Sequence, residues 1–282
     1  MRWPAVLLVM LLACGPGGRA TDVDGPVGGG SDGPGGDGAS VPFKVYVHSD
    51  HVLYSVDVAA KQLITVGPFK APQVSGAEDV ITDLAVAPDS TIYVISETAL
   101  YTASASDGHV TRVGSLAACG TRGVALTTTP DGKLWTGDFK GAVCEIDIAV
   151  SPPVVKAPTM LQGGFALSGD LVAIDDGTVF GTVYKLADGA GMGTQANNVL
   201  AKITLTTGAV VQVGATGYPK LFGTAFAGGS VLAFTHDGTG HVATIDRMTG
   251  VGTMFATFTD PVSQQPISFA GAGVSSLVGV IQ

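Results

Sequence analysis

The residues of this chain that could do chemistry are carboxylates and histidines that stand where short apolar runs begin or end. Several carboxylates around one point could bind a divalent cation through oxygen or place an acid and a base on a substrate. His48 and His51 flank Asp50, and His236 precedes Asp237, so nitrogen ligands for a metal are also available. The candidate binding residues are Asp50, Asp83, Glu97, Arg122, Asp138, Asp170, His236 and Asp237, with Lys220 beside them.

No spacing among these residues is diagnostic of a reaction. The chain contains no GxSxG, HExxH, Walker loop or GxGxxG between a strand and a helix, which argues against the common hydrolases, zinc proteases and nucleotide-dependent enzymes. The interpretation that we favour is that the polar residues cap strand ends in water and that the histidines are solvated loop residues. We therefore assign no catalytic residue, no metal ligand and no cofactor.

The elements that carry these residues recur along the chain. Five segments that align without gaps each hold two β-rich runs around a turn, and they begin at residues 52, 99, 142, 199 and 241. A second set of strand–turn–strand segments alternates with the first, so that the two sets together form a unit of four strands. The second set covers residues 83–96, 123–138, 170–183 and 223–236.

Four strands every ~45 residues is the spacing of β-propeller blades. The longer third interval contains an insert, residues 186–198, and no helical period of 3.6 competes in the domain. Residues 43–50 match the second strand of a blade, with no first strand before them. Residues 267–274 match the first strand of a blade. If these two pieces share a sheet, five blades close a ring without free edges; six blades are the alternative.

Two stretches add a family resemblance. TPDGKLWTGDFKGAVCEID resembles two-component-regulator propeller repeats, and DLAVAPDSTIYVISETALYTAS is similar to NHL and related propeller repeats. The shared motifs are structural turns, so the resemblance implies the all-β propeller fold over residues 42–282 and no particular function. Within it we expect Trp135 to be a packing residue.

Propeller geometry places the candidate residues on one rim. The loops before each first strand and those between the second and third strands meet there, and this is the usual binding face. The first strands start with Asp83, Arg122, Asp170 and Phe222. This mixed set argues against a ring of metal ligands at one depth, and a divalent cation in the central channel is therefore the secondary hypothesis.

Cys119 and Cys144 project to the same rim of one blade. A disulfide between them can form outside the cytoplasm and would contribute about 3 kcal/mol by restricting the unfolded chain. It requires Cα atoms closer than about 7 Å. The sequence leaves open whether the bond forms or the two thiols stay free.

The first forty residues predict where the protein is located. Arg2 precedes an apolar run too short to span a membrane, which is typical of a secretory signal. Leu11-Leu12-Ala13-Cys14 resembles the lipobox of bacterial lipoproteins, which implies that residues 1–13 are removed and that Cys14 is lipidated. An ordinary signal peptide is the alternative. Gly15 after the cysteine favours the outer membrane by analogy with that family. Residues 14–41, dominated by Gly, Pro, Ser and Asp, predict a disordered tether.

The composition limits the partners. Hydrophobic residues make up 46% of the chain, yet no segment after the signal resembles a spanning helix, so the apolarity must be buried between short strands. The net charge of −9 excludes a basic field for nucleic acid. We expect a monomeric, extracytoplasmic, lipid-anchored scaffold that binds a protein, peptide or glycan. The alternative is a metal-dependent propeller lyase or hydrolase with carboxylates at the central channel.

Overall fold

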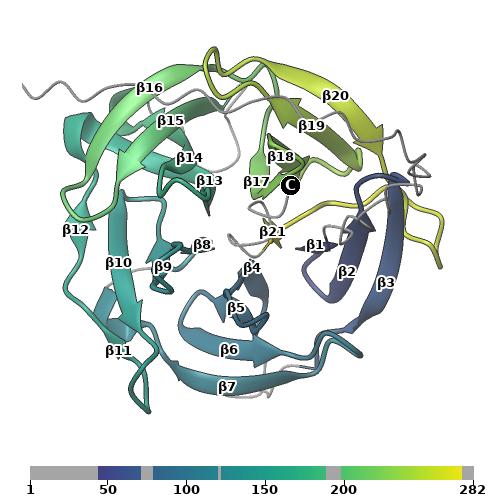
Figure 1. The fold of residues 1–282 in the computed structure, drawn as a ribbon, viewed down its shortest axis with the longest axis horizontal. Helices are drawn as coiled ribbons and strands as arrows, with labels where there is room; N and C mark the ends of the chain where they lie inside the picture. Colours follow the sequence, from purple (N-terminus) through teal and green to yellow (C-terminus); the bar gives the residue numbers. More distant parts are fainter. Residues whose placement is uncertain (1–43, 71–78, 120–121, 189–197, 275–282) are drawn as a thin grey trace, which may run out of the picture. The chain divides into compact units, whose positions relative to one another are not determined.

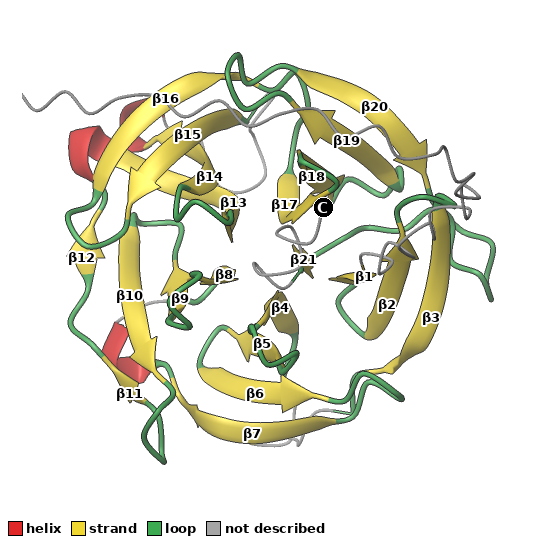
Figure 2. Ribbon diagram, in the orientation of Figure 1, coloured by secondary structure: helices red, strands yellow, loops and turns green. Residues whose placement is uncertain are grey.

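The computed structural model describes residues 44–70, 79–119, 122–188 and 198–274, and within these ranges the chain is built almost entirely of strands (Figure 2). The predicted signal, Cys14 and the tether lie outside the described residues, as does most of the insert at 186–198. Where helical turns occur they are short: η1 (Ala117–Cys119), η2 (Gln162–Gly164) and η3 (Leu186–Asp188). In the described ranges, no helix has the length and apolar character needed to cross a bilayer.

The strands form five antiparallel sheets arranged as blades around a central axis, with the innermost strand of each blade named first (Figure 1). Blade A is β21 (Gly271–Gly273), β1 (Lys44–His48), β2 (Val52–Asp57) and β3 (Gln62–Pro68), and blade B is β4 (Ile81–Val86), β5 (Ile92–Ser96), β6 (Ala99–Ala103) and β7 (Val110–Ser115). Blade C is β8 (Ala125–Thr128), β9 (Leu134–Gly137), β10 (Ala142–Asp147) and β11 (Val154–Val155), with β12 (Thr159–Met160) also on β10. Blade D is β13 (Phe165–Ala173), β14 (Val179–Lys185), β15 (Val199–Thr204) and β16 (Ala209–Ala215), and blade E is β17 (Leu221–Ala227), β18 (Ser230–Thr235), β19 (His241–Ile245) and β20 (Gly252–Thr257).

The ring closes through blade A, where strands from the two ends of the repeat region share one sheet. β21 pairs antiparallel with β1, so that Tyr46 lies opposite Gly273 and His48 opposite Gly271. The predicted arrangement with five blades is therefore confirmed, and the alternative with six is wrong. The closing strand is shorter than the predicted run of residues 267–274, because only three of its residues pair with β1.

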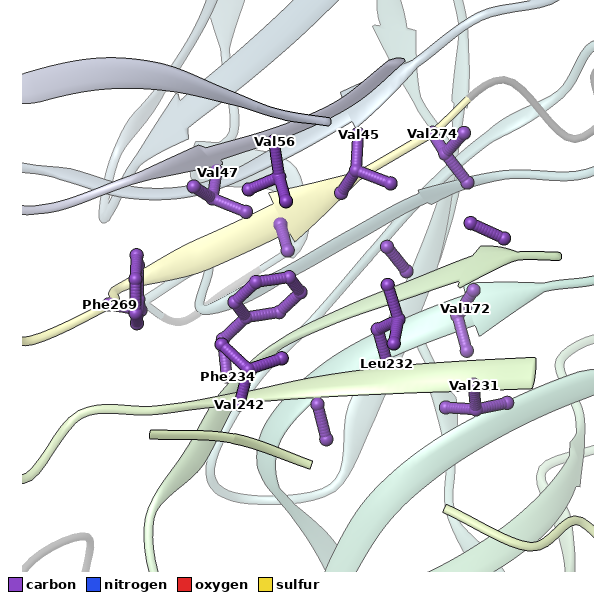
Figure 3. Packing of buried hydrophobic residues seen from close by; sticks show 14 of the residues in the cluster. Val45, Val47, Val56, Val172, Val231, Leu232, Phe234, Val242, Phe269 and Val274 are labelled. Carbon is purple, nitrogen blue, oxygen red and sulfur yellow. The ribbon is translucent and has the colours of Figure 1, made fainter. Parts of the chain in front are cut away.

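The hydrophobic core lies between neighbouring blades. Figure 3 shows one such layer, in which Val45 and Val47 of β1 face Leu232 and Phe234 of β18 across the boundary between blades A and E. Similar clusters fill the boundaries between blades A and B, B and C, and C and D. Each sheet therefore buries both faces, which explains why its strands are continuously apolar rather than alternating. Trp135 is 6% exposed in the cluster between blades C and D, which confirms its packing role.

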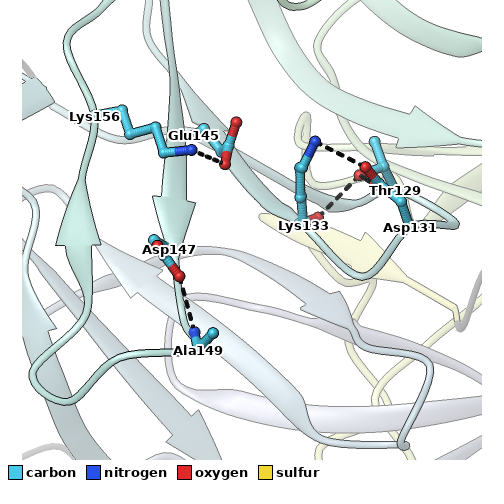
Figure 4. Close-up of polar contacts among 7 residues, drawn as sticks. All are labelled: Thr129, Asp131, Lys133, Glu145, Asp147, Ala149 and Lys156. Carbon is cyan, nitrogen blue, oxygen red and sulfur yellow. Dashed lines mark hydrogen bonds and ion pairs between the residues drawn. The ribbon is translucent and has the colours of Figure 1, made fainter.

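Blade C has a weak outer edge. Its fourth strand is only two residues long, because Pro152 and Pro153 precede it and proline cannot donate to a ladder. Side chains add to the few backbone hydrogen bonds between β10 and β11. Lys156, just after β11, forms an ion pair with Glu145 of β10 (Figure 4).

Cys119 and Cys144 form a disulfide in blade C, with Cα atoms 6.0 Å apart. The bond joins η1, just before the innermost strand, to β10, and both cysteines are buried. It thus connects the two regions that the sequence places on one rim, and the question of whether the thiols pair is settled in favour of the bond.

We expect the double variant Cys119→Ala/Cys144→Ala to lose about 3 kcal/mol of free energy of unfolding, because the 25-residue separation is no longer closed in the unfolded chain. Urea unfolding of oxidised wild type and variant measures the difference. Wild type unfolded and refolded under reducing conditions is the control and should match the variant. A loss below about 1 kcal/mol in the variant would show that the bond contributes little.

Candidate functional site

Three innermost strands carry a β-bulge at the same end of the axis. The register shifts between Ile81 and Asp83 in β4 and between Leu221 and Gly223 in β17, which leaves Thr82 and Phe222 without a partner in the ladder. β13 has a wider irregularity between Leu167 and Leu171. Bulges bend a strand and redirect its side chains, and they are common beside active sites.

The residues at the bulges line a cavity of about 130 Å³, which we call the axial mouth. All five blades contribute to it, from the starts of the innermost strands and from the loops between second and third strands. This is the rim that propeller geometry predicts. The lining residues are Asp50, Val80, Ile81, Thr82, Glu97, Val124, Phe139, Gly169, Phe222, His236 and Ala270.

Aromatic rings form one wall of the axial mouth. The rings of Phe222 and His236 are stacked, with centroids 4.8 Å apart and planes 9° apart. Phe139 lies 6.4 Å from Phe222, tilted by 46°. Nδ1 of His236 is 3.0 Å from the carbonyl oxygen of Phe269, which fixes the orientation of the imidazole. The wall is thus apolar and held in place from the neighbouring blade A.

Two carboxylates also line the axial mouth. Asp50 is exposed in the loop between β1 and β2, and Glu97 is half-buried between β5 and β6. Glu97 forms an ion pair of 3.1 Å with Arg122, whose side chain is 71% exposed. Of the predicted residues, Asp50, Glu97 and His236 therefore line the mouth. Arg122 does not line it but contacts Glu97, which does.

Asp83 lies beneath the floor of the mouth and is fully buried in β4. Its Oδ1 accepts the N–H of Leu84 at 2.8 Å, and its Oδ2 accepts the N–H of Leu126, in the next blade, at 2.5 Å. Innermost strands have an unpaired edge toward the axis, where there is little water to satisfy backbone groups. The carboxyl group supplies those acceptors and joins blade B to blade C.

Asp170 repeats this arrangement in blade D. Its Oδ1 accepts the N–H of Leu171 at 2.6 Å, and its Oδ2 accepts the N–H of Thr224 in blade E at 2.6 Å and the Thr224 hydroxyl at 3.2 Å. Asp83 and Asp170 come from non-adjacent blades, yet their side chains hydrogen-bond to each other. The two carboxyl groups therefore meet at the axis.

Burial controls the protonation of this carboxyl pair. Burial, followed by the nearby charge of Asp170, raises the pKa of Asp83 well above its usual range. Burial also raises the pKa of Asp170, to about 7, although hydrogen bonds from Asp83 and from Thr224 and Leu171 oppose the rise. The pair thus retains a proton near neutral pH, and the protonated Asp83 donates to Asp170.

His48 lies beside the pair and is also fully buried, contrary to the expectation that the histidines are solvated loop residues. Its Nδ1 is 2.8 Å from the carbonyl oxygen of Ser49, while Nε2 has no hydrogen-bond partner. Burial lowers its pKa to about 4, so the ring is neutral at pH 7. Gly271 separates His48 from Asp83: a Cβ at this position would lie 2.2 Å from Oδ1 of Asp83 and 2.4 Å from Nε2 of His48.

The remaining predicted residues support loops. Asp138 is 2% exposed, and its Oδ1 accepts the N–H groups of Lys140 and Ala142 at 2.9 and 2.8 Å. Asp237 accepts the N–H of Thr239 at 3.1 Å. Neither carboxylate lines the axial mouth. Their short-range bonds shape the loops that carry Phe139 and His236.

The structure divides the predicted residues into a group at the solvent-facing mouth and a buried group. The sequence did not predict this division. Asp50, Glu97 and His236 face solvent at the mouth, whereas Asp83 and Asp170 are acceptors for buried backbone groups. The available signal was the Asp-Leu dipeptide inside the apolar runs ITDLAV and SGDLVA. Across the described part of the chain, no group of three or more His, Cys, Asp or Glu side chains is arranged to hold a metal.

A second concave surface lies between blades C and D. This open groove, of about 720 Å³, is formed by the turns after β8 and β13 and by the end of β15. Its tryptophan, Trp135, is almost completely covered, and the nearby Lys133 is paired with Asp131 at 2.9 Å. None of the candidate residues from the sequence lines this groove, and the axial mouth, to which all five blades contribute, is the stronger candidate.

The comparisons with known proteins concern the fold. No protein-family model matches the chain, and no curated protein matches its sequence. A chain from the nidogen/laminin complex is 13% identical, with 82% of this chain and 98% of that chain covered and a TM-score of 0.52. A streptogramin B lyase (14% identity, 80% and 71% covered, TM-score 0.43) and virginiamycin B lyase from Staphylococcus aureus (11%, 81% and 73%, 0.43) are more distant in shape. These identities bear on the fold alone, and by its fold the chain is a five-bladed β-propeller.

Proposed function

We propose that the protein is a non-enzymatic binding protein whose axial mouth receives one projecting side chain of a protein or peptide partner. The observation that carries this proposal is that residues at three bulges, Thr82, Gly169 and Phe222, line one cavity. Half-exposed aromatic residues in a concave surface are typical anchoring points of protein interfaces.

The size of the mouth favours a side chain over a free small molecule. Its volume of about 130 Å³ is well below the ~300–1,000 Å³ of typical small-molecule and cofactor sites. The mostly apolar lining also suits a side chain better than a hydroxyl-rich sugar, which needs many hydrogen-bond partners. We therefore favour a protein or peptide over a glycan.

The metal-dependent lyase or hydrolase is the alternative. It would require Asp83 and Asp170 to give up the proton that they hold near neutral pH and to have further ligands beside them. Across the described residues, no group of three or more His, Cys, Asp or Glu side chains is arranged to hold a metal. We therefore favour the binding function.

Site-specific photo-crosslinking tests the proposal. We would place a photoreactive phenylalanine analogue at Phe222 in the mouth and, as a control, at Met248, which is 81% exposed between β19 and β20. A partner should crosslink from position 222 and not from 248, and unlabelled wild type should compete. Equal crosslinking from both positions, or none from 222, would contradict binding at the mouth.

We also propose that the propeller works outside the cytoplasm on a lipid anchor, as the sequence around Cys14 predicts. The Cys119–Cys144 disulfide supports this compartment, because such bonds persist where the environment is oxidising.

Cys14→Ser is expected to move the protein from the membrane fraction to the soluble fraction, because the cysteine thiol is the site of lipidation and stable anchoring needs acyl chains. Fractionation followed by immunoblotting measures the change. Ser40→Ala, in the predicted tether, is the control and should leave the protein on the membrane. A membrane fraction that is unchanged in Cys14→Ser would refute the anchor.

A further inference from the structure

The axial mouth combines carboxylates with aromatic rings, and we propose that it binds a cationic side chain, lysine or arginine, of the partner. This inference rests on the proposed function, because it names the group that would enter the mouth. It is carried by the charges, the rings and the dimensions of the cavity.

The charged side chains that line the mouth are acidic. Asp50 and Glu97 face it, and no lysine or arginine is among its lining residues. Arg122 already pairs with Glu97 from outside the cavity, at 3.1 Å, so a guanidinium group is compatible with this rim. Asp50 forms no ion pair within the described residues, which leaves one carboxylate for an incoming cation.

Among the described residues, four phenyl rings of the chain lie beneath one of its own cations, and the two phenylalanines at the mouth are not among them. Elsewhere the chain places its own cations over phenyl rings: Lys61 over Phe255 at 4.6 Å and Lys185 over Phe165 at 4.5 Å. In the part of the chain that the structure describes, no lysine or arginine lies over Phe139 or Phe222. A partner could supply that cation, with a cation–π attraction of about 0.5–2 kcal/mol.

The dimensions agree with one side-chain terminus. The cavity, of about 130 Å³, is several times larger than the ~10–15 Å³ that one water molecule needs by the same measure. A guanidinium or ammonium group with its last methylene groups fits this space, with the apolar stem against Val80, Val124 and Ala270 and the charge toward Asp50. This division of a long basic side chain into an apolar stem and a charged end is its usual mode of packing.

Capped tetrapeptides Gly-Gly-X-Gly test the inference, with arginine, lysine, citrulline or norleucine at X. Citrulline and norleucine match the shapes of arginine and lysine without the charge. Binding to the full-length, disulfide-bonded chain carrying Cys14→Ser is measured by NMR titration. We expect the arginine and lysine peptides to bind about tenfold more tightly than their neutral counterparts, as an ion pair plus a cation–π contact predicts.

Variants identify the groups responsible. Asp50→Asn should weaken binding of the charged peptides about fivefold and Phe222→Ala about tenfold. Asp50→Asn should leave the affinities of the neutral peptides unchanged, so that the preference for charged peptides becomes smaller. Asp57→Asn is the matched control, because Asp57 also lies in blade A but outside the mouth, where it accepts the N–H of Ala60. It should leave all four affinities unchanged.

The outcomes separate this inference from the proposed function. If norleucine and arginine peptides bind equally and Phe222→Ala weakens both, the mouth binds side chains without selecting cations, and only the cation selectivity fails. It also fails if no peptide binds at concentrations of about 10 mM, near the weakest affinity that one contact would give. The crosslinking at position 222 then decides the proposed function independently.

Discussion

Asp170→Ala is expected to lower the free energy of unfolding by about 4 kcal/mol. The substitution leaves the backbone N–H groups of Leu171 and Thr224 without their acceptor, and it removes the hydrogen-bond partner of Asp83. Each buried group left unpaired costs about 1–3 kcal/mol. Urea unfolding, followed by circular dichroism, measures the change in midpoint and slope.

Two further variants make the result interpretable. Asp176→Ala, in the exposed turn of the same blade, removes a single bond to the N–H of Thr178 and should cost at most about 1 kcal/mol. Asp170→Asn retains one side-chain oxygen as an acceptor and should fall between the two. If Asp170→Ala is no less stable than Asp176→Ala, the carboxyl group does not join blades D and E.

The protein is expected to lose stability as the pH rises above about 6.5. Burial, with the charge of Asp170, holds the pKa of Asp83 well above its usual range, so the folded chain binds a proton that the unfolded chain has already released. Folding stability therefore falls by about 1.4 kcal/mol per pH unit until Asp83 ionises in the folded state. Asp170 adds to this fall up to its pKa of about 7.

At lower pH a second buried group acts in the opposite direction. Burial lowers the pKa of His48 from 6.5 to about 4, so between these values the unfolded chain binds the additional proton and stability rises with pH. Between pH 4 and 6.5 His48 therefore offsets the carboxyl pair. Above pH 6.5 the contribution of His48 to stability is constant. Among these three groups, only Asp83 and Asp170 then change the stability with pH.

Thermal unfolding between pH 6 and 9 measures this dependence. Asp83→Asn is the informative variant, because its amide can donate to Asp170 as the protonated carboxyl does but cannot lose a proton. It should unfold at a lower temperature than wild type at pH 6 and show a flatter dependence on pH. His48→Gln is the control and should keep the wild-type slope above pH 6.5. Equal slopes in wild type and Asp83→Asn would contradict a retained proton at Asp83.

Much of the fold could be predicted from the sequence, because a propeller repeats one simple unit. Turns such as Pro130-Asp131-Gly132 mark the same position in successive blades. The unmatched strands at 43–50 and 267–274 also predicted how the ring closes. The sequence could not decide between five and six blades, since that depends on whether β1 and β21 pair with each other, and pairing between distant strands leaves no local pattern.

The site was less predictable, for a physical reason. A carboxylate at the start of a strand can face solvent or can turn inward to accept backbone N–H groups, and both choices have the same sequence. The bulges in β4 and β13 decide the matter for Asp83 and Asp170. Phe222 lines the mouth at a bulge, and its one signal in the sequence is that it is apolar where the other first strands begin with charged residues.

The pairing of β21 with β1 has a consequence for biosynthesis. During translation, β1 emerges among the first of the described strands, while its inner neighbour, Gly271–Gly273, is among the last. Until those three residues leave the ribosome, β1 exposes an unpaired apolar edge, the kind of surface that promotes aggregation. We therefore expect the nascent chain to depend on chaperones until synthesis is nearly complete, and a circular permutant that begins at β21 to depend on them less.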